Sequence, residues 1–197
     1  YYPTTSGETY MNMDGDDIFD FCWVNPEAAV EIRFKINGEG WIVGTENCGI
    51  YARGDGYLTL YWYNYYNTVP IDESEYHTIW MAPYNQKTYS MTIDGKGYGM
   101  ARRDGEYYGN YNYSIGGENT PHGNFNFVYA KFWESNQSYF DNEAPMYYVL
   151  PAADNKCKVS MWGDSFNMIN ENQGSDAYCT FHEGGFDGWN YIEVAVP

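Results

Sequence analysis

Tyrosines gather in two short stretches of this chain, and their spacing points to ligand binding. The first aromatic block spans residues 61–66 and the second spans residues 107–113. Tyrosine rings beside Asn amides suit stacking on the C–H faces of sugars, while neighbouring polar groups bond the sugar hydroxyls. The alternative is that these rings lie under loops or cover the outer face of a sheet. The tyrosines predicted to contact a ligand are Tyr61, Tyr63, Tyr65, Tyr66, Tyr108 and Tyr111.

No motif for catalysis accompanies the tyrosines. The chain has no G-x-S-x-G nucleophile elbow, no H-E-x-x-H metal motif and no phosphate-binding loop. Two carboxylate pairs, Asp72 with Glu75 and Asp141 with Glu143, stand in turn-like segments. With 27 acidic residues in the chain, pairs of this kind arise by chance. We therefore expect a protein that is not an enzyme.

The cysteines favour disulfides over a metal site. Cys22, Cys48, Cys157 and Cys179 are too far apart for a C-x-x-C motif, which argues against zinc. An even count in an acidic, Tyr- and Asn-rich chain favours disulfides and an oxidising compartment. The sequence-local pairing joins Cys22 to Cys48 and Cys157 to Cys179; the other pairings and four free thiols remain open.

Alternation of apolar and polar residues predicts that strands position these side chains. Residues 29–37 alternate strictly, and residues 58–63 place Leu60 and Tyr61 on opposite faces. Turn dipeptides such as Asp94-Gly95 separate the runs. No segment has an apolar stripe at helical spacing. We predict an all-β protein, a two-sheet antiparallel jelly-roll sandwich of about ten to thirteen short strands. Further strands are expected at residues 78–81, 88–93, 125–133, 146–150, 158–162, 177–182 and 191–196.

Composition limits the partners of the chain. It has 197 residues, which suit one domain, and a formal net charge of −17. Such acidity disfavours binding to nucleic acid or to anionic membranes. No run of apolar residues is long enough to span a bilayer. Because the chain begins at Tyr1 without a charged-then-apolar leader, we expect a processed secreted protein or an excised module.

The order of motifs resembles the LamG-like branch of the concanavalin A-like jelly rolls found in bacterial surface and phage tail proteins. The resemblance spans roughly residues 10–185 and implies one jelly-roll domain, with residues 186–197 as an extension, either an added edge strand or an assembly arm. Laminarinase-type relatives carry E-x-D-x-x-E on one strand, and this chain lacks that pattern. The segments that carry the resemblance are residues 30–36, 41–45, 49–52, 57–60, 77–80, 87–96, 128–134, 146–152 and 159–169.

The resemblance also raises the possibility of calcium. Many LamG-type domains hold Ca²⁺ at a sandwich rim with oxygen ligands. Asp14, Asp16 and Asp17 could supply such oxygens here, although clustered Asp residues are also common in turns. We expect no other cofactor.

Two functions from different classes follow. The first is an extracellular, non-catalytic recognition module that binds glycan or another surface ligand through tyrosine-rich loops. The second is a structural subunit of a fibre, surface layer or phage tail, which self-assembles through the same tyrosines. Either would act outside the cell or on a cell or virion surface.

Overall fold

Strand β4 (Ala29–Gly38) shows why this sequence forms sheets. Val30, Ile32 and Phe34 are completely buried, whereas Glu31 and Arg33 between them keep contact with solvent. Successive side chains of a strand point to opposite faces, so this alternation gives the strand one apolar face and one polar face. Two sheets whose apolar faces pack together bury both, and this is the arrangement in the computed structural model.

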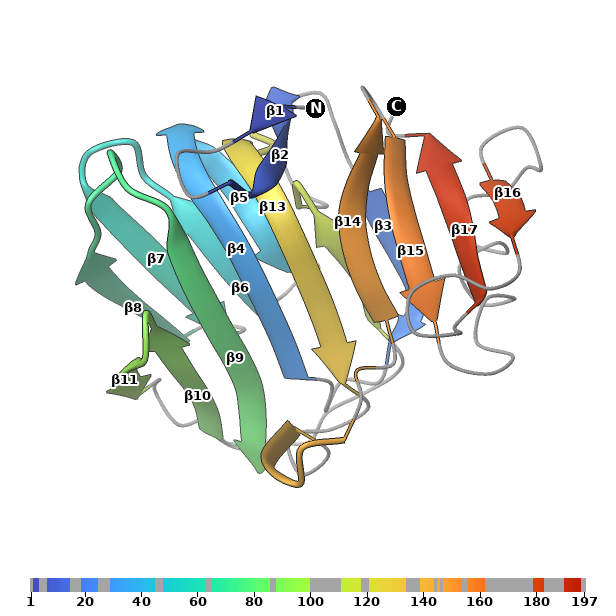
Figure 1. Cartoon of the computed structure of the whole chain (residues 1–197). Helices are drawn as coiled ribbons and strands as arrows, with labels where there is room; N and C mark the ends of the chain where they lie inside the picture. Colours follow the sequence, from blue (N-terminus) through green and yellow to red (C-terminus); the bar gives the residue numbers. More distant parts are fainter. Residues whose placement is uncertain are drawn as a thin grey trace.

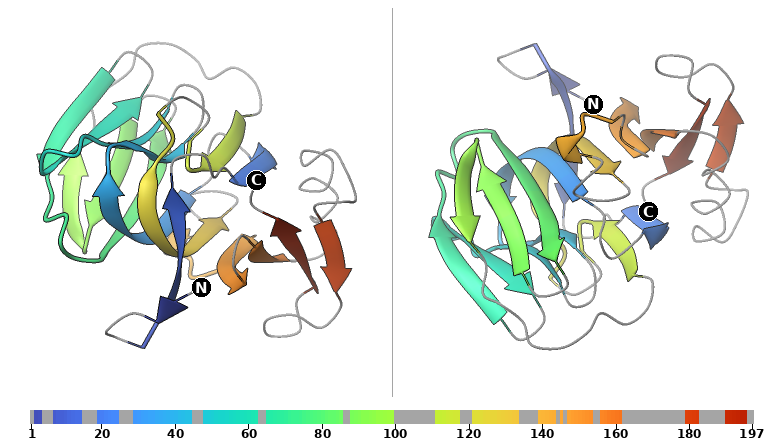
Figure 2. Two further views of the ribbon diagram at one scale, coloured as in Figure 1. Left: turned by 90° about the horizontal axis from the view of Figure 1, so that it is seen from above. Right: turned by 90° about the horizontal axis from the view of Figure 1, so that it is seen from below.

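The larger sheet has eleven strands and the smaller has six, and every named strand pair is antiparallel (Figures 1 and 2). The two-sheet antiparallel β-sandwich predicted from the sequence is therefore confirmed. The structure describes residues 2–3, 7–14, 19–24, 29–44, 48–62, 65–85, 88–99, 111–117, 121–133, 139–143, 145, 147–153, 156–161, 179–182 and 190–195. Within this part of the chain no helix has the length and hydropathy to cross a membrane.

The larger sheet has the order β11-β10-β9-β4-β13-β14-β15-β17-β16, and β2 also pairs with β13. Strand β1 (Tyr2–Pro3) pairs with β2 alone. The other strands of this sheet are β2 (Thr9–Asp14), β9 (His77–Asn85), β10 (Thr88–Ile93), β11 (Lys96–Gly99), β13 (Asn124–Trp133), β14 (Tyr147–Ala153), β15 (Lys156–Met161), β16 (Cys179–His182) and β17 (Asn190–Ala195).

The smaller sheet has the order β3-β12-β5-β6-β7-β8. Its strands are β3 (Phe19–Val24), β5 (Gly40–Gly44), β6 (Cys48–Ala52), β7 (Tyr57–Trp62), β8 (Tyr65–Pro70) and β12 (Tyr111–Ile115). Six strands were not expected from the sequence, because they are short or lack a clear alternation: β1, β2, β3, β8, β11 and β12. Strands β5 and β6 were indicated only by segments of the family resemblance, residues 41–45 and 49–52.

The turn between β10 and β11 confirms one local prediction. Asp94 and Gly95 have φ angles of 50° and 83°, which match a two-residue hairpin turn with positive φ at both positions. The Asp94 carboxylate accepts hydrogen bonds from the Thr78 backbone amide (2.8 Å) and contacts Nδ1 of His77 (2.6 Å). The turn thus anchors the start of β9, where His77 stands as the first residue of the strand.

The core lies between the sheets. Phe34 and Phe125 of the larger sheet meet edge to face at 6.1 Å, and both are fully buried. Ile42, Ile50 and Leu58 of the smaller sheet are buried opposite them. Burying one such side chain stabilises a fold by roughly 1.5–3 kcal/mol. The inner faces of both sheets are buried in this core, so the outer faces are the ones that can contact a ligand.

The C-terminal strand does not lie where the sequence suggested. We expected residues 186–197 to form an added edge strand or an assembly arm. Instead, β17 pairs with β15 on one side and with β16 on the other, so it lies inside the larger sheet. The alternating apolar residues of β17 suit an interior strand as well as an edge strand. The strand is interior because β16 also pairs with it.

The cysteines stand on four strands. Cys22 lies on β3 and Cys48 on β6, with β12 and β5 between them; Cys157 and Cys179 both lie opposite Val194 of β17, on its two sides. Disulfide formation and the pairing of these cysteines stay predictions.

Candidate functional site

A groove of about 480 Å³ crosses the outer face of the smaller sheet. We call it the tyrosine groove. Strands β6, β7 and β8 form its floor. The β6–β7 turn and the bend between β4 and β5 supply its charged rim. Its lining residues are Glu39, Tyr51, Arg53, Asp55, Thr59, Tyr61, Tyr66 and Thr68.

The register of three strands brings the floor of the groove together. Tyr51 lies opposite Thr59, and Thr59 lies opposite Thr68 on the next strand. Two residues along β7, Tyr61 lies opposite Tyr66, and their ring centroids are 6.3 Å apart. The core buries five of their neighbours in sequence, namely Ile50, Ala52, Leu58, Leu60 and Val69. Alternation therefore explains why these tyrosines and threonines share the outer face.

A glycine lets a tryptophan join the tyrosines. Trp41 stands on β5 and Tyr61 on β7, with β6 between them, yet their ring centroids are only 5.2 Å apart. Gly49 of β6 lies opposite Tyr61 and has no side chain to separate the two rings. A Cβ on Gly49 would lie 3.4 Å from Trp41 Cζ3 and 2.5 Å from the carbonyl oxygen of Val43. Trp41 also meets Tyr51 at 5.2 Å, edge to face.

A carboxylate orients Tyr51 at the rim. The Tyr51 hydroxyl donates a hydrogen bond to Glu39 Oε1. Burial first, and then the hydrogen bond and the negative charge of Glu39, raise the pKa of Tyr51 to about 12. Tyr51 therefore stays protonated at physiological pH, and its hydroxyl remains directed at Glu39.

An ion pair borders the other side of the groove. Arg53 Nη2 lies 3.0 Å from Asp55 Oδ2, and both side chains are nearly half exposed. The guanidinium also stands 5.7 Å from the ring centroid of Tyr57, a cation–π contact. The groove thus offers aromatic faces, two threonine hydroxyls and charged rim groups, which together suit a ligand with C–H faces and many hydroxyls.

The structure places only part of the predicted ligand-binding set in this groove. Tyr61 and Tyr66 line it, and Tyr66 is the most exposed of the large hydrophobic side chains described, at 68%. Tyr65 lies on β8, opposite Trp62, and Tyr111 lies on β12, two strands beyond β6. Tyr63 and Tyr108 lie outside the described residues. Ligand contact by all six tyrosines stays a prediction.

Sequence reasoning missed Trp41, Tyr51 and Glu39. Tyr51 follows Ile50 in an alternating run, so the alternation could have placed it on the outer face. Nothing in the sequence could have placed Trp41 beside Tyr61, because that contact depends on the strand order β5-β6-β7.

The calcium ligands predicted from the sequence are described only in part. Asp14 ends β2, opposite Asn124, whereas Asp16 and Asp17 lie outside the described residues. No three His, Cys, Asp or Glu side chains in the described ranges gather as a metal site would require. Calcium therefore stays a prediction.

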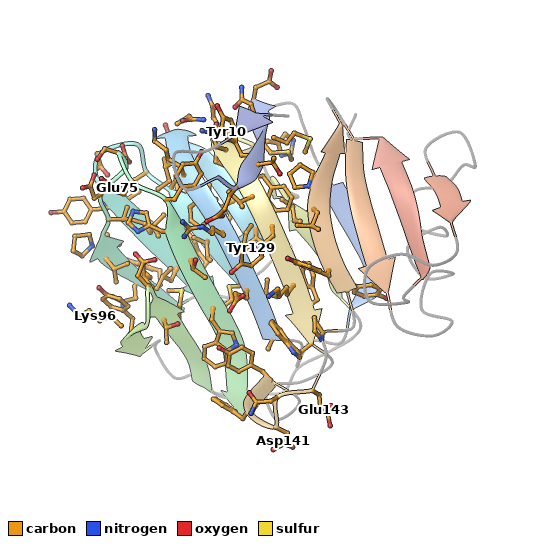
Figure 3. All side chains as sticks on the ribbon, in the orientation of Figure 1. Tyr10, Glu75, Lys96, Tyr129, Asp141 and Glu143 are labelled. Carbon is orange, nitrogen blue, oxygen red and sulfur yellow. The ribbon has the colours of Figure 1, made fainter. Side chains whose placement is uncertain are left out.

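Of the two carboxylate pairs, Asp72 takes part in a turn. Asp72 Oδ1 accepts hydrogen bonds from the backbone amide (2.9 Å) and the hydroxyl (2.6 Å) of Ser74, which lower the pKa of Asp72 and close a turn. The backbone carbonyl of Glu143 accepts a hydrogen bond from Trp133 Nε1 at 2.9 Å. The side chains of Asp141 and Glu143 lie at the lower end of the molecule, exposed to solvent (Figure 3).

Comparison with known proteins gives only a distant likeness. No family model matches the chain, and no curated protein matches it either. One solved structure, the receptor binding domain of botulinum neurotoxin mosaic serotype C/D, has 12% identity and a TM-score of 0.37 over 82% of this chain. A second, the botulinum neurotoxin serotype D binding domain, has 12% identity and a TM-score of 0.35 over 96% of this chain. The chain spans 59% and 66% of those two chains, respectively. Membership of the LamG-like family stays a prediction.

Proposed function

We propose that this protein is a non-catalytic module that binds a carbohydrate chain in the tyrosine groove, outside the cell or on a cell or virion surface. The observation that carries the proposal is the aromatic row Trp41, Tyr61 and Tyr66, which crosses three strands of one sheet. Aromatic rings with accessible faces stack on sugars, and the exposed ring of Tyr66 has no role in the core.

The tilt of the rings selects one kind of carbohydrate. Tyr61 is inclined by 47° to Trp41 and by 42° to Tyr66, so the rings do not form one flat platform. A flat platform would suit the surface of a crystalline polysaccharide. A twisted row in a groove suits a single soluble chain, whose sugar rings also turn from one to the next. Thr59 and Thr68 in the floor supply hydroxyls for its polar edge.

A binding screen with paired variants tests the proposal. Soluble polysaccharides are screened by affinity electrophoresis, and each ligand found is measured by calorimetry, with and without a calcium chelator. Tyr61→Ala and Tyr66→Ala should each weaken binding about tenfold or more, the loss expected for a central aromatic contact. Tyr57→Ala is the matched control, because Tyr57 is a 44% exposed tyrosine of the same sheet outside the groove lining.

Two results would contradict the proposal. The first is equal binding by the Tyr57, Tyr61 and Tyr66 variants. The second is no carbohydrate binding together with self-association that Tyr66→Ala abolishes, which would make the groove an assembly contact of a structural subunit. Loss of binding with the chelator would place calcium in the site.

A further inference from the structure

The larger sheet opens into a second groove on its own outer face, away from the tyrosine groove. We call it the split groove; its volume is about 590 Å³. Strand β13 pairs with β2 through Asn124–Phe127 and with β14 through Ala130–Phe132, on the same edge. Val128 and Tyr129, between these stretches, pair with neither strand in the described register. The residues that line the groove are Gly7, Glu8, Thr9, Arg33, Thr78, Val128, Tyr129, Tyr148 and Leu150.

A β-bulge builds the floor of the split groove. Phe127 lies opposite Phe34 and Tyr129 lies opposite Arg33, so Val128 is an extra residue on β13. The bulge breaks the alternation, and two consecutive residues, Val128 and Tyr129, both line the groove. On the far side of the bulge Ala130 returns to the core.

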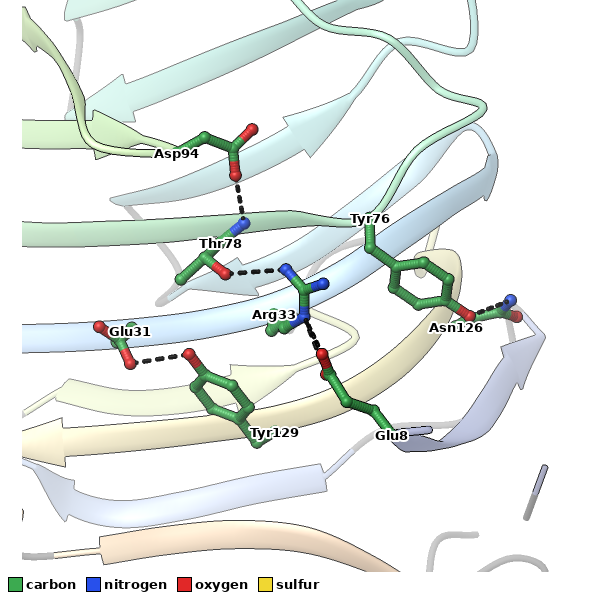
Figure 4. A network of polar contacts seen from close by, with 8 residues as sticks. All are labelled: Glu8, Glu31, Arg33, Tyr76, Thr78, Asp94, Asn126 and Tyr129. Atoms are coloured by element: carbon green, nitrogen blue, oxygen red, sulfur yellow. Dashed lines mark hydrogen bonds and ion pairs between the residues drawn. The ribbon is translucent and has the colours of Figure 1, made fainter. Parts of the chain in front are cut away.

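Arg33 stands in this groove with its guanidinium fixed. Nε donates to both carboxylate oxygens of Glu8, at 3.1 and 2.9 Å, and Nη1 donates to Thr78 Oγ1 at 3.1 Å (Figure 4). The ring of Tyr76 lies 5.7 Å away. Nη2 donates no hydrogen bond to any part of the chain that the structure describes. The guanidinium is therefore oriented before a ligand arrives, and among the described residues Nη2 keeps a donor for that ligand.

The contact with Glu8 shows that the Arg33 guanidinium can bind a carboxylate. Glu8 directly precedes β2, so its carboxylate comes from the start of that strand and reaches Arg33 of β4 (Figure 4). Its side chain is 35% exposed, so water or another carboxylate can reach the pair. A pair this exposed contributes only about 0.2–1 kcal/mol, and a ligand carboxylate can replace it.

Aromatic rings and hydroxyl groups line the rest of the split groove. Tyr129 and Tyr148 meet edge to face at 6.2 Å, and Thr9 and Thr78 add hydroxyls. Arg33 and Glu8 are the two charged residues among those that line the groove, so the guanidinium supplies its positive charge for an anionic ligand.

We propose that the split groove binds a carboxylate-bearing sugar, a uronic acid residue, with Glu8 as an internal competitor for Arg33. Such a sugar offers one group for each part of the groove. Its carboxylate binds Arg33, a C–H face packs on Tyr148 or Tyr129, and its hydroxyls bond Thr9 and Thr78. This site is independent of the tyrosine groove, because the two lie on different sheets.

The test uses two ligands that differ only in the carboxylate. Methyl glucuronide and the neutral methyl glucoside are titrated into the full chain at low salt, and binding is followed by NMR chemical shifts. We expect the glucuronide to bind roughly ten- to hundredfold tighter, the difference that a charge-assisted hydrogen bond produces. Arg33→Gln should remove this preference. Glu8→Gln should strengthen glucuronide binding about two- to fivefold, because it removes the competitor.

Controls separate this site from general electrostatics and from the tyrosine groove. Lys35→Gln makes the same charge change on the same strand outside the groove lining, and Tyr66→Ala disrupts the other groove; both should leave glucuronide binding unchanged. Three outcomes overturn the proposal: equal binding of both ligands, equal losses in the Arg33 and Lys35 variants, or weaker binding in Glu8→Gln. Equally tight binding of an N-acetyl-aspartate amide would also overturn it, because the groove would then read the carboxylate without the sugar.

Discussion

At the scale of single residues, the tyrosines of this protein differ in what surrounds their hydroxyls. Tyr66 is exposed, whereas Tyr51 is held by Glu39 and Tyr129 donates to Glu31 Oε2 at 2.9 Å. Burial and a neighbouring carboxylate raise the pKa of both Tyr51 and Tyr129. Residue type alone predicted an aromatic surface. The carboxylate partners come from other elements, Glu31 from strand β4 and Glu39 from the bend between β4 and β5, and no local pattern predicts these contacts.

The raised pKa of Tyr51 predicts how stability depends on alkaline pH. Because the folded pKa, about 12, lies above the usual value near 10, folding favours the protonated hydroxyl. That contribution is complete below about pH 10 and is lost as pH rises through about 12. Tyr51→Phe removes it. Urea unfolding from pH 9 to pH 12 should show the free-energy difference between wild type and Tyr51→Phe shrinking as pH rises.

Glu39→Gln gives a second measure of the same contact. Without the carboxylate, the pKa of Tyr51 should fall towards its usual value, seen as earlier ionisation in an ultraviolet titration. A free-energy difference that does not change with pH, together with an unchanged titration in Glu39→Gln, would contradict the assigned contact.

At the scale of elements, one local feature of a strand shapes each groove: a glycine in β6 and a β-bulge in β13. Gly49 opens β6 so that Trp41 reaches Tyr61, and the bulge at Val128 turns two neighbouring residues of β13 to the same face. An isolated glycine within a strand pattern is a sequence signal for close approach, so Gly49 could have been noticed. The bulge has no such signal, because Phe127 and Val128 are both apolar and fit either face.

Substitution of Gly49 tests the first of these features. The Cβ of Gly49→Ala would lie 2.5 Å from Val43 O and 2.9 Å from Gly44 Cα, so the backbone of β5, the strand that carries Trp41, must shift. We expect a loss of roughly 2 kcal/mol or more in the free energy of unfolding, measured by urea denaturation, and a change in tryptophan fluorescence.

Gly97→Ala is the matched control for this substitution. Gly97 also lies within a strand, and a Cβ there would meet nothing within 4 Å. Its stability should stay within about 0.5 kcal/mol of wild type. Equal effects of the two substitutions would show that the glycine at position 49 is not required by packing.

At the scale of the whole molecule, the chain uses its two sheets for one core and two different outer faces. The C-terminal strand β17 belongs to the larger sheet through six register pairs with β15 and four with β16. A strand paired on both sides stabilises its neighbours, whereas an arm that docks on another molecule would not.

Truncation distinguishes these roles. Removing residues 186–197 deletes β17, leaves β15 as an unpaired edge and should lower the melting temperature by roughly 10 °C, the shift that ~3 kcal/mol produces in a chain of this size. Removing only residues 196–197, which follow β17, should leave the melting temperature unchanged. The measurements are thermal unfolding and size-exclusion chromatography. A truncated chain with an unchanged melting temperature would contradict the interior placement of β17.

The sequence by itself determined the all-β class, several strands with their buried faces, the Asp94-Gly95 hairpin and the outward position of Tyr61. These follow from alternation and turn chemistry, which act between residues close in sequence. Tertiary structure alone decided the strand order, the meeting of Trp41 with Tyr61, the ties of Glu39 to Tyr51 and of Glu8 to Arg33, and the interior place of β17. Pairings between strands far apart in sequence depend on which sheet each strand joins, and many orders satisfy the same local pattern.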